Sequence, residues 1–248
     1  MRGFLQLVRF EFLLQLRQPF AAFFTLAFPP MLVLIFGSIY GNAPRPDSGG
    51  YGTVDISVPG YIALIVITAA IFNLPISLAS YRERGILRRL AVTPVSPLVL
   101  LSSQLSALAI LIACGTVLLV LVAKVGYDLR FPGSLPSAFA AGLIGAGALL
   151  AVGFALAAVM PSARTATVTA MVIAYPMLFL SGAALPRELL PTHVREFAAV
   201  LPATPLVTLL RAAWDAQPWW RQDLGAILAS LAWSVAGTAV AAWRFRWE

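Results

Sequence analysis

Few residues in this sequence could perform acid–base, nucleophilic or metal chemistry. The chain has one cysteine, Cys114, and one histidine, His193, which excludes an internal disulfide and a cysteine-based metal site. It contains neither the nucleophile motif Gly-x-Ser-x-Gly nor the phosphate-binding motif Gly-x4-Gly-Lys-[Ser/Thr]. We therefore expect no catalytic residue, no metal and no cofactor on this chain, and any ATP hydrolysis must occur on a separate subunit.

The most informative polar residues form a short charged segment, residues 81–97. Its charged side chains are Arg82, Glu83, Arg84, Arg88 and Arg89. Ile86, Leu87 and Leu90 fall near one face of a helix, and that helix ends before Pro94, because the residue preceding a proline avoids the helical region. A short amphipathic helix of this kind could fit a groove in a partner protein. A charged connector that only sets membrane topology fits the pattern equally well.

Aromatic residues in two apolar stretches could bind an organic compound. They are Phe23, Phe24 and Phe28 in the first stretch and Phe72, next to Asn73, in the second. Their side chains could line a path for an aromatic or amphipathic compound, or they could simply face lipid. The clear apolar stretches hold no Asp, Glu, Lys, Arg or His in their interior. This absence disfavours a proton-driven carrier and a path for small cations.

The composition places these residues in a membrane. The chain has 248 residues, of which 60% are hydrophobic and 11% charged, and its mean hydropathy is +0.88. Soluble domains are about 45–50% apolar and about 25% charged, so a soluble enzyme, a DNA-binding domain and a disordered chain are all disfavoured. The net charge of +7 reflects basic loops at a membrane surface and not nucleic-acid binding, since no basic cluster with aromatic platforms occurs.

The hydropathy pattern predicts an all-α integral membrane protein with six transmembrane helices in a single domain, residues 1–248. Each span needs about 20 residues, and the predicted spans are 20–40, 58–80, 98–123, 137–160, 165–185 and 225–242. A polar connector, residues 41–57, follows the first span. The proline-rich residues 186–224 predict an outer re-entrant hairpin or two short interfacial helices.

The first 18 residues predict an amphipathic helix lying at the membrane interface. Arg9, Glu11 and Arg17 fall between apolar positions, which is typical of a helix in the headgroup plane. The alternative is that this segment lengthens the first span. With six spans and a cytoplasmic N-terminus, ten of the 17 Lys and Arg residues lie inside, so the positive-inside rule favours cytoplasmic N- and C-termini.

Several of these residues together resemble a known family, the type-2 ATP-binding-cassette (ABC) transporter permeases. Glu83, Arg84, Gly85, Leu87, Arg88 and the pair Thr93-Pro94 look like its signature E-R-G-T-L-x-x-L-x-x-T-P. Residues 9–19 resemble its interface helix, and residues 179–182, followed by Pro186 and residues 190–191, resemble its landmarks after the fifth span. Two departures are Ile86, where threonine is usual, and Arg89, where an acidic or neutral residue is common.

The resemblance implies an ATP-driven exporter built from several subunits. Two permeases, identical or different, would pair around a path, and two separate ATPase subunits carrying ATP and Mg would dock below them. The segment from Arg82 to Thr93 would be the coupling helix seated in the ATPase. Family members reside in the bacterial inner membrane, contact lipid, and export drugs, antibiotics, glycans, lipid-linked molecules or cations. A membrane enzyme and a membrane scaffold without transport are the rival interpretations.

Overall fold

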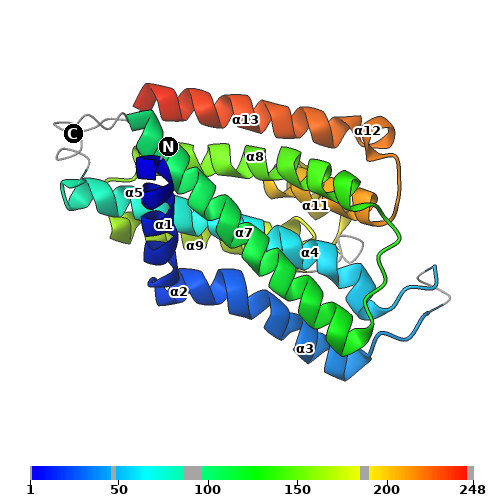
Figure 1. Ribbon diagram of the computed structural model, residues 1–248. Coiled ribbons are helices and arrows are strands. Elements are labelled where there is room, and N and C mark those ends of the chain that lie inside the picture. The colour runs from blue at the N-terminus through cyan, green and yellow to red at the C-terminus, as the bar shows by residue number, and fades with distance from the viewer. Residues whose placement is uncertain (1, 46–48, 87–96, 185–189, 245–248) are drawn as a thin grey trace.

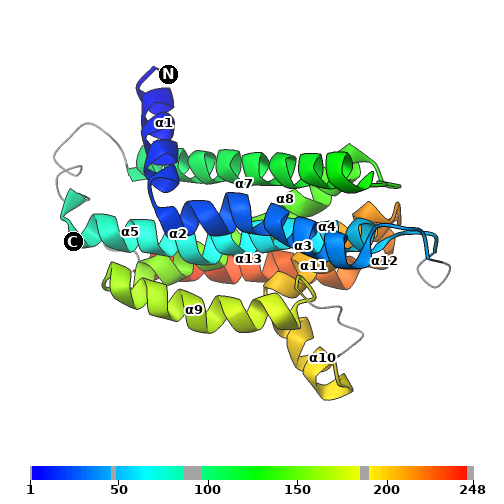
Figure 2. The same ribbon diagram turned by 90° about the horizontal axis from the view of Figure 1, so that it is seen from below.

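The structure is a computed structural model that describes residues 2–45, 49–86, 97–184 and 190–244. The regular structure in these residues is entirely helical, and six helices are long and apolar enough to cross a membrane. These helices lie side by side in an elongated bundle (Figures 1 and 2). The prediction of an all-α protein with six spans is therefore confirmed.

The first two spans are each assembled from three consecutive helical segments. The first comprises α2 (Pro19–Ala22), the π-helix η1 (Phe23–Ala27) and α3 (Phe28–Tyr40). The second comprises α4 (Thr53–Ile67), the π-helix η3 (Thr68–Asn73) and α5 (Leu74–Glu83). The remaining spans are α7 (Pro97–Tyr127), α8 (Leu135–Val159), α9 (Ala163–Leu180) and α13 (Leu224–Arg244).

The second span is longer than predicted at both ends. It runs from Thr53 to Glu83, whereas hydropathy predicts residues 58–80. Its first turn takes in Asp55, which falls in the predicted connector, and its last takes in Arg82 and Glu83, which fall in the predicted coupling segment. Hydropathy misses these turns because the helix continues through polar residues that find partners at the ends of other helices.

Each π-helix is followed, after one intervening residue, by proline. Pro29 and Pro30 lie in the first turn of α3, just after η1, and Pro75 lies in the first turn of α5, just after η3. A proline ring clashes with the carbonyl four residues earlier and offers no amide hydrogen. The wider winding of a π-helix is one way in which a helix accommodates such a disruption. A proline inside a helix indicates a kink, but it does not indicate a π-helix.

The second span forms the centre of the bundle, with most of its residues buried. Its core side chains include Ile67, Ile71 and Leu78, which are fully buried. Helix α8 approaches it so closely that a Cβ atom on Gly153 would overlap the carbonyl oxygen of Ala70 in η3. The second span is therefore held on all sides by neighbouring helices.

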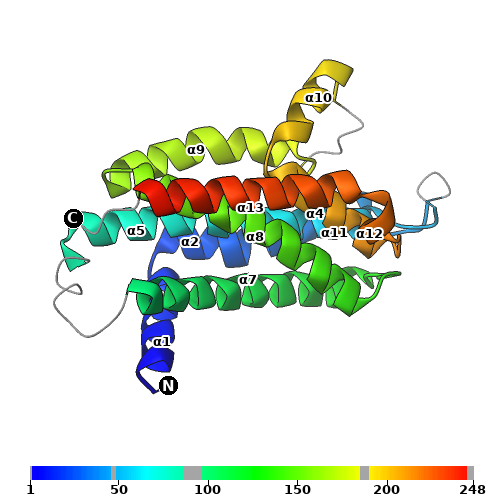
Figure 3. The same cartoon turned by 90° about the horizontal axis from the view of Figure 1, so that it is seen from above.

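Two shorter elements lie outside this parallel arrangement. Helix α1 (Arg2–Leu16) is separate from the first span and crosses the bundle near the start of α7 (Figure 2). Helices α10 (Thr192–Val200) and α11 (Ala203–Trp214) are bent by 98° relative to one another. Helix α11 packs inside the bundle while α10 projects from it (Figure 3). This bend is the geometry that a re-entrant hairpin requires, and α12 (Trp219–Gln222) then leads into α13.

Candidate functional site

An aromatic cavity of about 320 Å³ lies between the first, second and fifth spans. Its described lining residues are Phe24, Phe28, Leu32, Phe36, Tyr61, Leu64, Thr68, Phe72, Tyr175, Leu178, Phe179 and Ala184. None of these side chains is charged. The rings of Phe24 and Phe28 have centroids 5.1 Å apart, and Phe72 meets Tyr175 edge-on at 6.1 Å. Such a lining suits an apolar or aromatic compound and offers few hydrogen-bonding groups.

Three of the five residues predicted for this path line the cavity, namely Phe24, Phe28 and Phe72. Phe23 instead lies beside Phe24, edge-on at 5.2 Å, with 42% of its surface exposed. Asn73 is buried and donates a hydrogen bond from Nδ2 to Thr25 Oγ1 at 3.3 Å. It thereby joins the two π-helices next to the cavity, a role that no local sequence pattern indicates.

The described start of the predicted coupling segment lies against the turn between α8 and α9. Arg82 Nη1 donates to the carbonyl oxygen of Met160 at 2.8 Å, and Glu83 Oε2 accepts from the amide of Ala163 at 3.1 Å. Arg84 is exposed and Gly85 adopts a positive φ of 66°. Glycine adopts this conformation without strain at the end of a helix. Leu87, Arg88, Arg89, Thr93 and Pro94 lie outside the described residues.

Helix α1 turns a partly polar face toward the protein and an apolar face outward. Glu11 and Gln15 are buried, whereas Leu5 and Phe10 are more than half exposed. Arg9 and Arg17 are also exposed. An outward apolar face is what a helix at a lipid interface presents, although its position in a membrane stays a prediction.

A buried hydrogen bond links α1 to the end of the second span. Glu11 Oε2 accepts from Tyr81 Oη at 2.6 Å. Burial raises the pKa of the Glu11 carboxyl, and the hydrogen bond from Tyr81 opposes that rise with a smaller effect. Helix α1 is therefore attached to the second span at Tyr81, the first residue of the predicted coupling segment.

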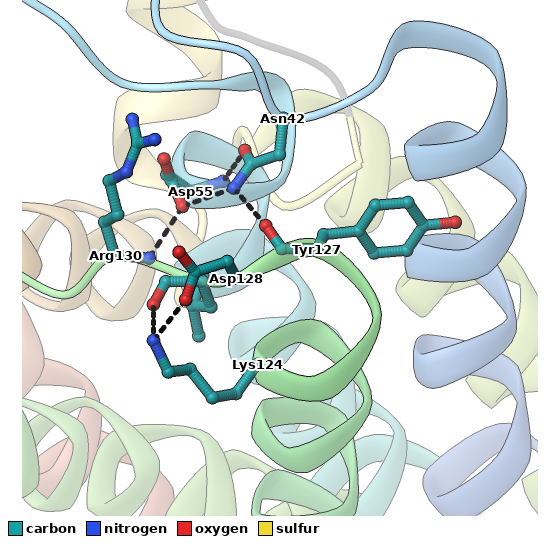
Figure 4. A network of polar contacts seen from close by, with 7 residues as sticks. Asn42, Asp55, Lys124, Tyr127, Asp128 and Arg130 are labelled. Carbon is teal, nitrogen blue, oxygen red and sulfur yellow. Dashed lines mark hydrogen bonds and ion pairs between the residues drawn. The ribbon is translucent and has the colours of Figure 1, made fainter.

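The opposite end of the bundle contains a polar network that sequence reasoning missed (Figure 4). Asp55 Oδ1 accepts from Asn42 Nδ2 and from the amide of Arg130, both at 2.9 Å, and Oδ2 accepts from the amide of Gly52 at 3.0 Å. Asn42 Nδ2 also donates to the carbonyl oxygen of Tyr127 at 2.9 Å. The network ties together the ends of α3, α4 and α7. One sequence signal could have indicated part of this network: Gly52 lies three residues before the acidic Asp55, a spacing that is typical of the start of a helix.

Comparison with known proteins places these features in one family. The family described as ABC-2 type transporter matches residues 2–214. The chain belongs to the ABC-2 type transporter family. This membership supports a membrane permease of an ABC transporter. The match extends from the start of α1 to the end of α11 and includes both the cavity and the charged segment.

Curated relatives of this ABC-2 permease are distant. It is 26% identical over 172 residues to the inner membrane transport permease YhhJ of Escherichia coli (strain K12), and equally similar to the protein of that name in Shigella flexneri. The alignment covers 68% of this chain but 44% of each relative. The chain thus spans less than half the length of these relatives.

Proposed function

We propose that this ABC-2 permease exports hydrophobic or amphipathic compounds, such as drugs, antibiotics or lipid-like molecules, using ATP hydrolysed by a separate subunit. The aromatic cavity is the observation that carries the proposal. Its volume of about 320 Å³ lies at the lower end of the range for sites that bind drug-sized ligands. The aromatic rings would hold apolar parts of a compound by burial and edge contacts.

The chemistry of the cavity also argues against other cargoes. A small cation would need carboxylate or carbonyl oxygens in its path, and no described lining residue carries a charge. A glycan would need many hydrogen-bonding groups, whereas the described lining offers chiefly Tyr61, Thr68 and Tyr175. An apolar or amphipathic compound satisfies the lining best.

In the proposed complex, two copies of an ABC ATPase, each with ATP and Mg, dock at the coupling segment, residues 81–97. A second permease, identical or different, completes the path. The termini are cytoplasmic, and the protein lies in a bacterial inner membrane. ATP drives export only if it binds two conformations of the complex with different affinity, because a ligand shifts an equilibrium by that difference alone.

The test is purification of the tagged chain from its native membrane, followed by an assay of ATP hydrolysis. A stoichiometric ATP-binding partner with vanadate-sensitive turnover supports the proposal. If neither purification nor crosslinking in intact membranes finds an ATPase, the transporter function is rejected and a scaffold or an enzyme becomes the better interpretation.

The cavity is tested in vesicles loaded with a lipophilic fluorescent dye. We expect Phe28→Ala combined with Phe72→Ala to lower dye-stimulated turnover about thirtyfold, because each ring contributes about 1 kcal/mol of aromatic contact and the pair about 2 kcal/mol. The control is Phe139→Ala on α8, where the ring is 73% exposed. Equal effects of the two variants would exclude the cavity as the path.

A further inference from the structure

Two adjacent side chains at the end of α5 bind both helices of the α8–α9 hairpin. Arg82 donates to the carbonyl oxygen of Met160, the C-cap residue that follows α8, and Glu83 accepts from the amide of Ala163, the first residue of α9. The turn between these two helix ends is only a few residues long. We call this arrangement the hairpin clamp, defined by Arg82, Glu83, Met160 and Ala163.

Each charge in the hairpin clamp matches the helix end that it contacts. A helix carries partial negative charge at its C-terminal end and partial positive charge at its N-terminal end. The Arg82 guanidinium lies at the C-terminal end of α8, and the Glu83 carboxylate lies at the N-terminal end of α9. Exchanging the two residues would place each charge at the end that repels it.

Glu83 supplies a cap that the α9 sequence does not provide itself. Ser162 Oγ accepts from the amide of Thr165 at 3.2 Å, and Thr165 Oγ1 accepts from the amide of Ser162 at 3.2 Å. The amide of Ala163 has no acceptor in this local capping box and donates to Glu83 instead. The start of α9 is therefore completed by a residue from the second span.

Helix α9 leads from the hairpin clamp directly to the aromatic cavity. It is one helix from Ala163 to Leu180, and its Tyr175 and Phe179 line the cavity. Helix α5, at the other side of the clamp, leads into the coupling segment. If the coupling segment moves, the clamp would therefore pull on the first turn of α9, the helix whose Tyr175 and Phe179 line the cavity.

We propose that Arg82 and Glu83 are positioning residues that fasten the coupling segment to the α8–α9 hairpin, so that α9 moves with the coupling segment. This inference rests on the proposed function, in which an ATPase moves that segment. It divides the residues assigned to ATPase docking into two groups. Arg82 and Glu83 bind the permease itself, and Arg84 belongs to the surface offered to the ATPase. Glu83 and Arg84 are both exposed, so the contact with Ala163, and not burial, distinguishes Glu83.

The clamp itself is tested on the isolated full chain in detergent by amide hydrogen exchange. Glu83→Ala should speed exchange in residues 160–166 about fivefold, the effect of losing one helix cap. Glu83→Gln keeps an acceptor and should have a smaller effect. The charge exchange Arg82→Glu with Glu83→Arg should have the largest effect, and Arg84→Ala should have none. Unchanged exchange in Glu83→Ala would overturn the clamp.

Transmission is tested in the complex with the ATPase, after Cys114→Ala removes the single cysteine. Spin labels at Val172→Cys on α9 and Val117→Cys on α7, both exposed, report the distance between these helices with and without ATP and vanadate. Labelled chains are diluted with unlabelled ones so that each distance lies within one chain. We expect Glu83→Ala to retain the ATPase but to lose at least half of the ATP-dependent change in distance.

Three outcomes separate this inference from the proposed function. A full distance change in Glu83→Ala overturns transmission through the clamp. Loss of the ATPase from Glu83→Ala also overturns it, because Glu83 would then act in docking. If no ATPase accompanies the unmodified chain, the proposed function fails and transmission fails with it, while the exchange measurement still decides whether the clamp holds the hairpin.

Discussion

Glu11 is a buried carboxyl in an otherwise amphipathic helix, and its environment makes stability depend on pH. Burial raises its pKa above the ordinary value of 4.5, so the folded chain binds this proton more tightly than the unfolded chain. The stability that Glu11 contributes is therefore full below its ordinary pKa and is lost as pH rises through the raised value.

We predict that Glu11→Gln removes this loss and raises the thermal unfolding midpoint at neutral pH, because glutamine still accepts from Tyr81. Midpoints measured in detergent between pH 4 and pH 8 check the prediction. Glu196→Gln, at an exposed position on α10, is the control and should follow the unmodified chain. A Glu11→Gln profile with the original pH dependence would contradict the assignment.

Asp55 is the residue on which the polar network at the other end depends. It accepts hydrogen bonds from Asn42, Arg130 and Gly52 while only 1% exposed. We predict that Asp55→Asn lowers the free energy of unfolding by about 1.5–3 kcal/mol, the range for a hydrogen bond to a charged group.

The matched control for this change is Asp128→Asn in the same region. Asp128 is exposed and pairs with Lys124 at 2.6 Å, an arrangement that contributes little in water. Its φ of 49° is one that asparagine tolerates. Thermal unfolding of both variants in detergent is the measurement, and similar losses from the two would argue against a special role for Asp55.

At the scale of whole helices, the contact between α8 and η3 requires glycine. A Cβ at Gly153 would overlap the carbonyl oxygen of Ala70, so Gly153→Ala should destabilise the fold by about 1–3 kcal/mol through overpacking. Gly147→Ala on the same helix meets no atom within 4 Å and should be neutral or stabilising by up to about 1 kcal/mol. Unfolding midpoints that do not differ would show that α8 can shift away from η3.

The membrane-spanning helices are largely predictable from sequence, because a long apolar run identifies a span whatever other residues pack against it. The predicted span 137–160 differs from α8 by no more than two residues at either end. The features that depend on distant residues are not predictable in this way. Glu83 caps a helix that begins 80 positions later, and Asp55 binds the amide of Arg130, 75 positions away.

For the candidate path, the sequence identifies aromatic residues that could line it. Which of these residues share a cavity depends on how the helices pack. Phe24 and Phe28 line it while Phe23 points elsewhere. Tyr175 and Phe179 on α9 complete it, and nothing in a single sequence brings the fifth span to the first.

At the scale of the whole molecule, the orientation in the membrane is a prediction from its arginines. In a Cys114→Ala background, Arg45→Cys should react with a membrane-impermeant maleimide in intact spheroplasts, whereas Arg164→Cys should react only after the cells are opened. Both positions are exposed. Arg45 lies in the connection between α3 and α4 and Arg164 in the first turn of α9, and these two elements lie at opposite ends of the bundle (Figure 2). The reverse pattern would place the termini outside.

The π-helices in the first two spans also affect how this sequence should be aligned. A π-segment corresponds to one residue inserted into a helix, and one residue rotates a helix by about 100°. In an alignment with a relative that lacks η3, α4 and α5 of this chain would therefore require registers that differ by one residue. Between residues 68 and 73, a single-residue gap inside a membrane helix would then be the correct alignment, although gaps in such helices are normally treated as errors.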